Sequence, residues 1–135
     1  MPGGLMLFSP MVDMTESGDS FQTNLGIDHA LAAGSLKRRT TLYAGGSPLT
    51  DAYLSPLYGD LTGFPPTLLV SGTRDLLLSD TVRMHRKLRS AGLDAELHIW
   101  EAMSHGGFGG ATPEDLQVEA EIRQFIARIR FRSRN

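Results

Sequence analysis

Three short apolar runs, separated by longer and more polar stretches, organise the chain. They are Leu5–Phe8, Thr67–Val70 and Ala95–Trp100. Runs of this length, bounded by turn-forming residues such as Ser9-Pro10, are typical of buried strands. The pattern therefore predicts three strands, each followed by a polar or glycine-containing turn.

Capped or amphipathic segments between the runs predict helices. In the first half, residues 11–26 are rich in turn formers and are expected as a loop. Asp28 is a candidate N-cap for a helix through residues 30–33, which Gly34 would break or weaken. A helical pattern resumes over residues 36–43 and ends at paired glycines.

The second half carries two stronger helix signals. Ser79 or Asp80 can cap a helix that ends near Ser90, with apolar positions on one face and basic positions on the other. The segment Thr112-Pro113-Glu114-Asp115 combines a capping threonine, a proline at the first position and acids in the first turn. It predicts the start of a long amphipathic helix, and the basic tail 130–135 is expected to fray.

The resulting order is strand, helix, strand, helix, strand, helix. Residues 47–66 hold four prolines and two glycines and are expected as an irregular crossing. This alternation favours a parallel sheet with right-handed crossovers. We therefore expect an α/β fold of three layers, a mostly parallel sheet with flanking helices, as a single domain over residues 1–135. Because almost nothing precedes the first run, we also expect a chain cut from something longer.

Composition narrows the class of protein. The 135 residues are 41% hydrophobic and 21% charged, as in soluble globular domains with a real core. The net charge of −2 gives no electrostatic case for binding nucleic acid or an anionic membrane. The sequence has no cysteine, so disulfides and thiolate metal sites are excluded, and this fits a cytoplasmic location. The short first apolar run predicts neither a signal peptide nor a membrane span.

The candidate chemistry lies in two loops that each follow a predicted strand. Asp75 follows the second strand and His105 follows the third, and α/β proteins place their reactive groups in such loops. If the two strands are neighbours, both loops reach the same sheet edge. A carboxylate can then fix the imidazole tautomer while the imidazole moves a proton. Gly106 and Gly107 allow a tight turn after the histidine.

Each residue also has a plain structural interpretation. Asp75 alone reads as a helix cap, His105 as a surface residue of a glycine-rich loop, and Asp80 as a cap or first-turn acid. His29, His85 and His98 are interpreted as structural or solvent-facing. Ser20 and Ser47 each follow glycine but lack the second glycine of a G-x-S-x-G elbow. The Gly106–Gly110 run does not match a nucleotide-binding fingerprint.

At these residues the chain resembles the C-terminal part of the hormone-sensitive-lipase-like esterases, an α/β-hydrolase group. The matching stretches are Leu7–Pro10, Tyr53–Tyr58, Pro65–Gly72, Asp75–Asp80, Leu88–Gly92 and Met103–His105. The resemblance implies that Asp75 is the triad acid, His105 the triad base, and Asp80 a supporting residue beside the acid. It also implies the last three strands of the hydrolase sheet and a C-terminal helix.

The family's His-Gly-Gly-Gly and Gly-Asp-Ser-Ala-Gly segments do not occur in these residues. Since the nucleophile and the oxyanion donors supply much of the rate enhancement, we expect the chain alone to be inactive. It would be a serine esterase fragment that acts on small acyl esters only when another chain complements it. The alternatives are a non-catalytic, self-associating module derived from a hydrolase and a generic α/β binding protein.

Partners and pocket follow from the same interpretation. An exposed apolar sheet edge predicts a homo-oligomer or binding of a complementing N-terminal half. Met103 and Phe108 flank the histidine loop and are candidate pocket residues, whereas Trp100 is expected in the core. No metal or organic cofactor is indicated, because the four histidines and the carboxylates lack ligand spacing.

Overall fold

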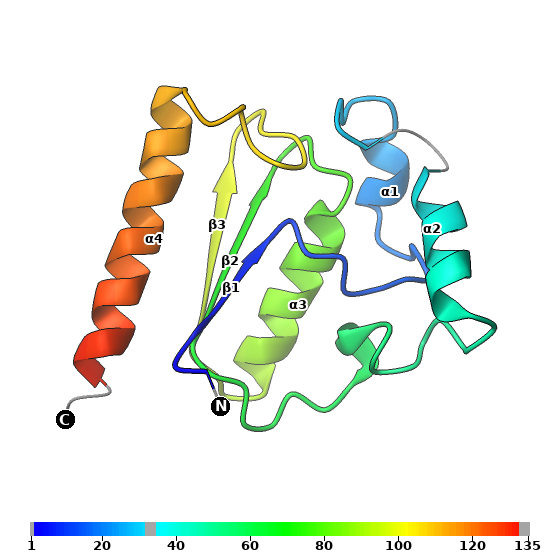
Figure 1. Cartoon of the computed structure of the whole chain (residues 1–135), viewed down its shortest axis with the longest axis horizontal. Helices are drawn as coiled ribbons and strands as arrows, with labels where there is room; N and C mark the ends of the chain where they lie inside the picture. The colour runs from blue at the N-terminus through cyan, green and yellow to red at the C-terminus, as the bar shows by residue number, and fades with distance from the viewer. Residues whose placement is uncertain (1, 32–34, 133–135) are drawn as a thin grey trace.

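The computed structural model describes residues 2–31 and 35–132 and contains a parallel sheet of three strands (Figure 1). The strands are β1 (Leu5–Phe8), β2 (Thr67–Gly72) and β3 (Ala95–Trp100), in the spatial order β1-β2-β3. Thr67 pairs with Leu5 on one side and with Ala95 on the other, so the carboxyl ends of the strands lie together. The three predicted strands are confirmed, and β2 continues two residues beyond the apolar run.

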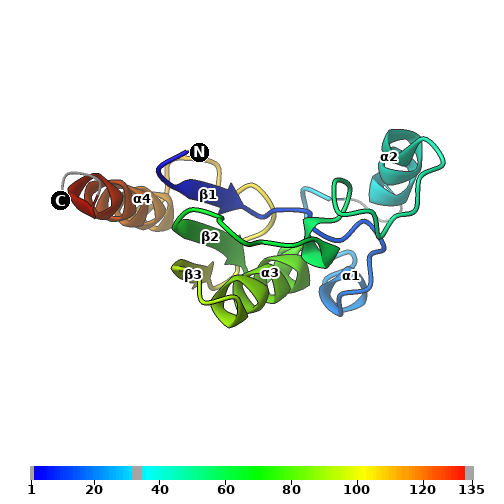
Figure 2. The ribbon, with the colours of Figure 1, turned by 90° about the horizontal axis from the view of Figure 1, so that it is seen from below.

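Two long helices cover opposite faces of the sheet and give the expected three layers (Figure 2). Helix α3 (Leu78–Ser90) packs on the face of β2 that presents Leu69. Helix α4 (Pro113–Arg132) packs on the other face through Phe125, which contacts the cluster around Leu68 and Val70. Because β2 is buried on both faces, it reads in sequence as a continuous apolar run.

The segment between β1 and β2 departs from expectation in two places. A short helix α1 (Ser20–Thr23) lies inside the stretch that was expected as a loop. Residues 29–31 are bends rather than helix, although Asp28 Oδ1 does accept hydrogen bonds from the amides of Ala30 and Leu31. The rest of that expected helix, with Gly34, lies outside the described residues.

The remaining elements mostly follow the sequence. Helix α2 (Ser35–Ala44) matches the second helical pattern, and the short 3-10 turn η1 (Pro56–Tyr58) lies within the irregular crossing. Helix α4 begins with the predicted cap, since Thr112 Oγ1 accepts from the Asp115 amide while Asp115 Oδ2 accepts from the Thr112 amide.

Two helix ends were predicted wrongly. Neither Ser79 nor Asp80 caps α3, which begins at Leu78 and has no side-chain cap at its first position. Helix α4 also continues through Arg132, so residues 130–132 are helical, and the last three residues lie outside the description. Over residues 2–31 and 35–132, no helix has the length and apolar character needed to cross a membrane.

Candidate active site

The acid loop, residues 72–78, is a compact turn between β2 and α3 that holds Asp75 with no side-chain exposure. Ser71 Oγ donates to Asp75 Oδ2 at 2.7 Å, and the Leu77 amide donates to Oδ1 at 2.9 Å. The second bond spans two residues and closes a turn just before α3, whose N-cap residue, Leu77, has no side-chain cap bond, so Asp75 is not the helix cap that its plain structural interpretation had it to be. Both carboxylate oxygens of Asp75 are thus held in place by residues close to it in the chain.

The histidine loop, residues 101–110, has a strongly turned backbone. Gly106 and Gly107 have φ angles of 87° and 94°, a left-handed region that other residues enter only at a cost. The Gly107 amide donates to the Ser104 carbonyl at 3.2 Å, which closes a tight turn around His105. On its far side, Asp115 of α4 accepts from the amides of Phe108 and Gly110 and ties the loop to the helix.

The two loops are in direct backbone contact. The Arg74 amide donates to the Met103 carbonyl at 3.1 Å, and the Ala102 amide donates to Thr73 Oγ1 at 2.8 Å. Gly72 lies so close that a Cβ there would come within 2.0 Å of the Met103 carbonyl oxygen. Only glycine fits at position 72 without a shift of the histidine loop.

This packing brings the predicted pair together. His105 Nδ1 lies 3.4 Å from Asp75 Oδ1, and the imidazole is about one-third exposed while the carboxylate is fully enclosed. One side of the imidazole thus faces a fixed acid and the rest of the ring reaches the surface. In a serine hydrolase, the acid and the base occupy such a relative position.

The electrostatics of the pair favour charge on both groups. Burial opposes ionisation of Asp75, but interactions with His105, Ser9 and Ser71 outweigh it and hold the pKa of Asp75 below its usual value. Asp75 in turn raises the pKa of His105 against the opposing effect of burial, and Asp28 adds to the rise. A carboxylate that stays ionised can stabilise an imidazolium as it forms.

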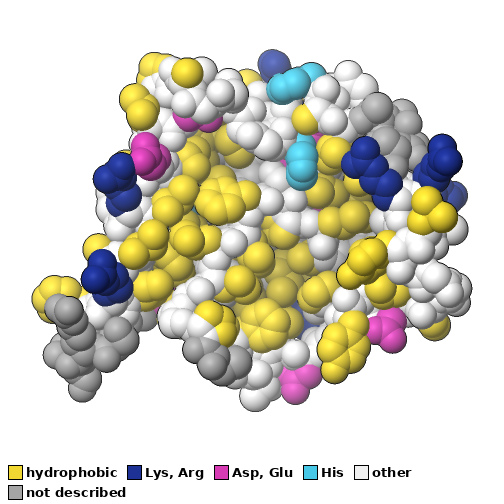
Figure 3. Space-filling model, in the orientation of Figure 1, with side chains coloured by type: hydrophobic (Ala, Val, Ile, Leu, Met, Phe, Trp, Pro, Cys, Tyr) yellow, Lys and Arg dark blue, Asp and Glu magenta, His cyan; other side chains and the backbone are white. Residues whose placement is uncertain are grey.

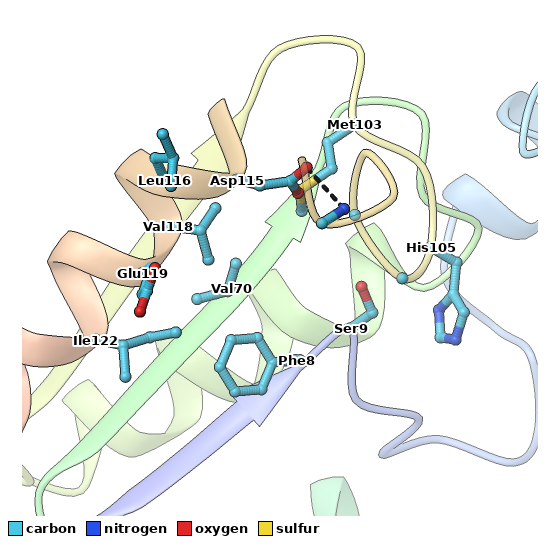
Figure 4. Close-up of a pocket in the computed structure, with 13 residues that line it drawn as sticks. Phe8, Ser9, Val70, Met103, His105, Asp115, Leu116, Val118, Glu119 and Ile122 are labelled. Carbon is cyan, nitrogen blue, oxygen red and sulfur yellow. Dashed lines mark hydrogen bonds between the residues drawn. The ribbon is translucent and has the colours of Figure 1, made fainter. Parts of the chain in front are cut away.

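A cavity of about 410 Å³ opens beside the pair (Figure 4). His105 and Ser9 stand at one end in Figure 4, Gly106 also lines the cavity, and the rest of the wall is mostly apolar. The apolar lining residues are Phe8, Val70, Met103, Leu116, Val118 and Ile122. Such a wall suits the acyl or alkyl part of a small ligand next to a proton-transfer group.

The other candidate residues have different settings. Met103 lies in the cavity wall, whereas Phe108 and Trp100 pack partly buried against the core cluster of α4. Ser20 is buried, and its hydroxyl donates to the Leu76 carbonyl at 2.7 Å and accepts from the Ser79 amide. These bonds give Ser20 a structural role in the acid loop.

Asp80 supports the chain that follows β1. Its Oδ2 accepts from the amides of Val12 and Asp13, both at 2.9 Å. Burial raises the pKa of Asp80 to about 6, and those two hydrogen bonds only partly oppose the rise. Neighbouring Asp13 is instead held charged by Ser17, Thr15 and Arg83 despite its burial, and its pKa lies well below the usual range.

The three remaining histidines lie apart from this arrangement. His29 is exposed, and His98 stacks on Trp100 with Glu96 and Glu121 nearby. Burial lowers the pKa of His85, which lies on α3. Within the described residues, no three His, Asp or Glu side chains are grouped as metal ligands would be.

Three buried polar side chains whose supporting role the sequence did not indicate pack against the acid loop and bind its backbone. Ser20, Asn24 and Asp28 are spaced four residues apart, and all three are buried against residues 73–79. Asn24 Nδ2 donates to the carbonyls of Thr73 and Asp75 at 3.2 and 2.8 Å. The spacing of four was the available signal, because it places polar groups on one face of a helical turn.

The sheet, its flanking helices and an acid–histidine pair at the carboxyl ends of adjacent strands define a protein of the α/β-hydrolase class. A family model described as the alpha/beta hydrolase fold matches residues 1–108, and the chain belongs to that family.

Its relatives are esterases. The chain is 32% identical over 132 residues to an esterase of Acinetobacter venetianus, a match that covers 96% of this chain and 44% of that protein. An acetyl-hydrolase of Streptomyces hygroscopicus is 29% identical over 105 residues, with 78% and 35% covered. The chain therefore spans less than half the length of these relatives.

Solved structures agree with the fold and with the resemblance. The crystal structure of esterase E25 superposes with a TM-score of 0.89 at 48% identity, covering 93% of this chain and 39% of that one. An esterase from the bacterial hormone-sensitive lipase family gives a TM-score of 0.87 at 35% identity, with 93% and 43% covered. The resemblance to hormone-sensitive-lipase-like esterases is thereby confirmed.

Proposed function

We propose that this chain supplies the acid and the general base of a serine carboxylic-ester hydrolase. The observation that supports this most is the 3.4 Å approach of His105 Nδ1 to the enclosed Asp75 carboxylate, at the end of an apolar cavity. Family membership and esterase relatives are consistent with it. Asp75 and His105 are the residues to which we assign the chemistry.

Their roles follow from the geometry. With Asp75 ionised beside Nδ1, the neutral imidazole carries its proton on Nδ1 and presents Nε2 as the base. Nε2 then takes the proton of an attacking hydroxyl and later returns it to the leaving alcohol. Asp75 stabilises the imidazolium between these two steps without taking the proton itself.

A hydroxyl nucleophile and oxyanion donors must come from outside these 135 residues, which contain no G-x-S-x-G sequence. We propose that a polypeptide carrying the serine elbow completes the site and that the isolated chain is inactive on esters. The substrate class is a small acyl ester, because the cavity beside His105 is largely apolar and about 410 Å³ in volume.

A second candidate is a self-associating module without activity. Among the described residues, β1 pairs only with β2, so its other edge is unpaired, and its Met6 and Phe8 side chains are 39% and 50% exposed. Figure 3 shows hydrophobic side chains gathered over the face that holds the strands and α4. A bare parallel edge of this kind favours association of two copies.

Complementation tests the first proposal. The part of esterase E25 that this chain does not cover is produced separately, mixed with the chain, and assayed on p-nitrophenyl acetate. We expect hydrolysis only in the mixture, and a loss of at least about a thousandfold with His105→Ala. His29→Ala, which removes an exposed imidazole, is the matched control and should retain activity.

Two results would count against the proposal. Turnover in the mixture that survives His105→Ala would remove the histidine from the chemistry. Hydrolysis by the isolated chain that depends on His105 would show that no complement is needed. Sedimentation of the isolated chain at micromolar concentration tests the second candidate, which a monomer would contradict.

A further inference from the structure

Asp28 is a buried carboxylate to which the sequence assigns only a helix cap, yet its two oxygens serve different parts of the molecule. Oδ1 accepts from the amides of Ala30 and Leu31 at 2.9 and 3.2 Å and closes a local turn. Oδ2 reaches out of that turn, and the residue as a whole is 5% exposed. The local bonds hold the carboxylate in one orientation, so Oδ2 has a fixed position.

Oδ2 lies between the two loops of the candidate site. It accepts from the Leu76 amide at 2.8 Å, one residue after the acid, and from the His105 amide at 3.4 Å. One oxygen thus contacts the backbone of both the acid loop and the histidine loop. The Leu76 bond has the length of a strong charge-assisted hydrogen bond, whereas the His105 bond is long.

The position of Asp28 is itself fixed by the acid loop. Asn24, one helical turn earlier, donates to the carbonyls of Thr73 and Asp75, and the Asp28 amide donates to the Asn24 carbonyl at 3.1 Å. Asp28 is therefore carried on a segment that is already docked against the acid. The hydrogen bond from the His105 amide to Asp28 connects this segment to the histidine loop as well.

We propose that Asp28 is a positioning residue that sets the separation between Asp75 and His105. It does so by binding the backbone of both loops with one oxygen. The inference rests on the function proposed for the pair, because the separation matters for proton transfer. Asp28 does not itself line the cavity, and it contacts His105 through the backbone amide and not through the imidazole.

The test uses the 135-residue chain itself and does not need activity. In Asp28→Asn only one oxygen remains, so the turn at Ala30 and the two loop amides can no longer all be satisfied, and the charge is lost. We expect the NMR pKa of the His105 imidazole to fall. We also expect exchange of the His105 amide to accelerate about tenfold relative to the Leu69 amide of β2, as loss of one charge-assisted bond would cause.

Asp19→Asn is the matched control. Asp19 is an exposed acid at the start of α1, makes no side-chain cap bond there, and loses the same charge in the variant. We expect no change in the pKa or amide exchange of His105. A variant Asp28→Asn that loses stability but keeps the His105 pKa and exchange ratio would overturn the proposal, since Asp28 would then act on the fold alone.

If Asp28→Asn does not fold, amide exchange in the wild-type chain still tests the proposal. The proposal requires the His105 amide to be protected within a few-fold of the Leu76 amide, because both bind one oxygen. Exchange of the His105 amide at the rate of an unstructured peptide would overturn it. Complementation that fails while these readings hold would count against the proposed esterase function and leave the role of Asp28 intact.

Discussion

The acid loop and the histidine loop follow adjacent strands of one sheet, but they are stabilised in different ways. In the acid loop, Asp75 is fully buried and takes its hydrogen bonds from Ser71 and Leu77, both within four residues of it. The histidine loop turns on glycines with positive φ, and its amides bind Asp28 and Asp115 from other elements.

The two members of the pair therefore differ in how their positions are fixed. The position of the carboxylate is set by its own turn. The hydrogen bonds of that turn also help a buried carboxylate to stay ionised. The position of the imidazole depends on residues brought in by the tertiary fold. Changes in the acid loop should therefore act on stability, whereas changes in the histidine loop should act on the pair with a smaller effect on stability.

The largest effect is expected from Asp75→Ala. Alanine leaves the Ser71 hydroxyl and the Leu77 amide without an acceptor in a buried turn. We expect a loss of about 3 kcal/mol in the free energy of unfolding, measured with urea. The control Asp19→Ala, at an exposed position, should change it by less than about 0.5 kcal/mol. Equal losses in the two variants would show that the acid loop is not supported by its carboxylate.

Gly72→Ala tests the contact between the two loops. The added Cβ would meet the Met103 carbonyl oxygen at 2.0 Å, so the backbone of one loop must move. We expect a loss of about 2 kcal/mol together with a displaced His105 imidazole resonance. Gly3→Ala, where nothing lies within 4 Å of the new Cβ, is the matched control and should leave both unchanged. An unshifted His105 signal in Gly72→Ala would contradict the close packing.

Gly106→Ala should cost less, because the added Cβ meets open space and only the φ angle of 87° is strained. We expect a loss of about 1 kcal/mol. Gly63 has a similar φ of 80° and also faces open space, so Gly63→Ala should lower the free energy of unfolding by about as much. Gly63 lies far from the pair and is the matched control. Only the Gly106 variant should alter the pKa of His105. A His105 pKa that responds to neither variant would contradict the idea that this turn aims the imidazole.

The smallest effect is a pH dependence of stability. Asp75 raises the pKa of folded His105 above the usual 6.5, so the pair contributes stability that is complete below about pH 6.5. That contribution is lost as the pH rises through the folded pKa. The free energy of unfolding of wild type minus that of His105→Gln should thus be about 0.5 kcal/mol larger at pH 5.5 than at pH 8.5. Urea unfolding of both proteins at each pH measures it. A difference that grows with pH would have the wrong sign.

Local sequence patterns were enough to predict the strands, the α4 cap and the adjacency of Asp75 and His105. Each of these depends on residues close together in the chain or on the general rule that parallel strands end at one edge. The distant partners of Asp28 and Asp80 were not predicted, because they lie 48 to 77 residues away and no local pattern encodes such contacts. The sequence suggested only a cap for Asp28, and the resemblance only a supporting place beside the acid for Asp80. Residues 30 and 31, which are bends, were predicted as helix because a capping acid looks the same in sequence whichever amides it binds.

The central claim is that Asp75 and His105 act as one charged pair, and an NMR titration of the His105 imidazole tests it most directly. In the wild-type chain we expect a pKa above 6.5, and in Asp75→Asn, which keeps an acceptor for the Leu77 amide, a clear fall below the wild-type value. The same pKa in both proteins would show that the carboxylate does not act on the imidazole, and the proposed acid–base site would be contradicted.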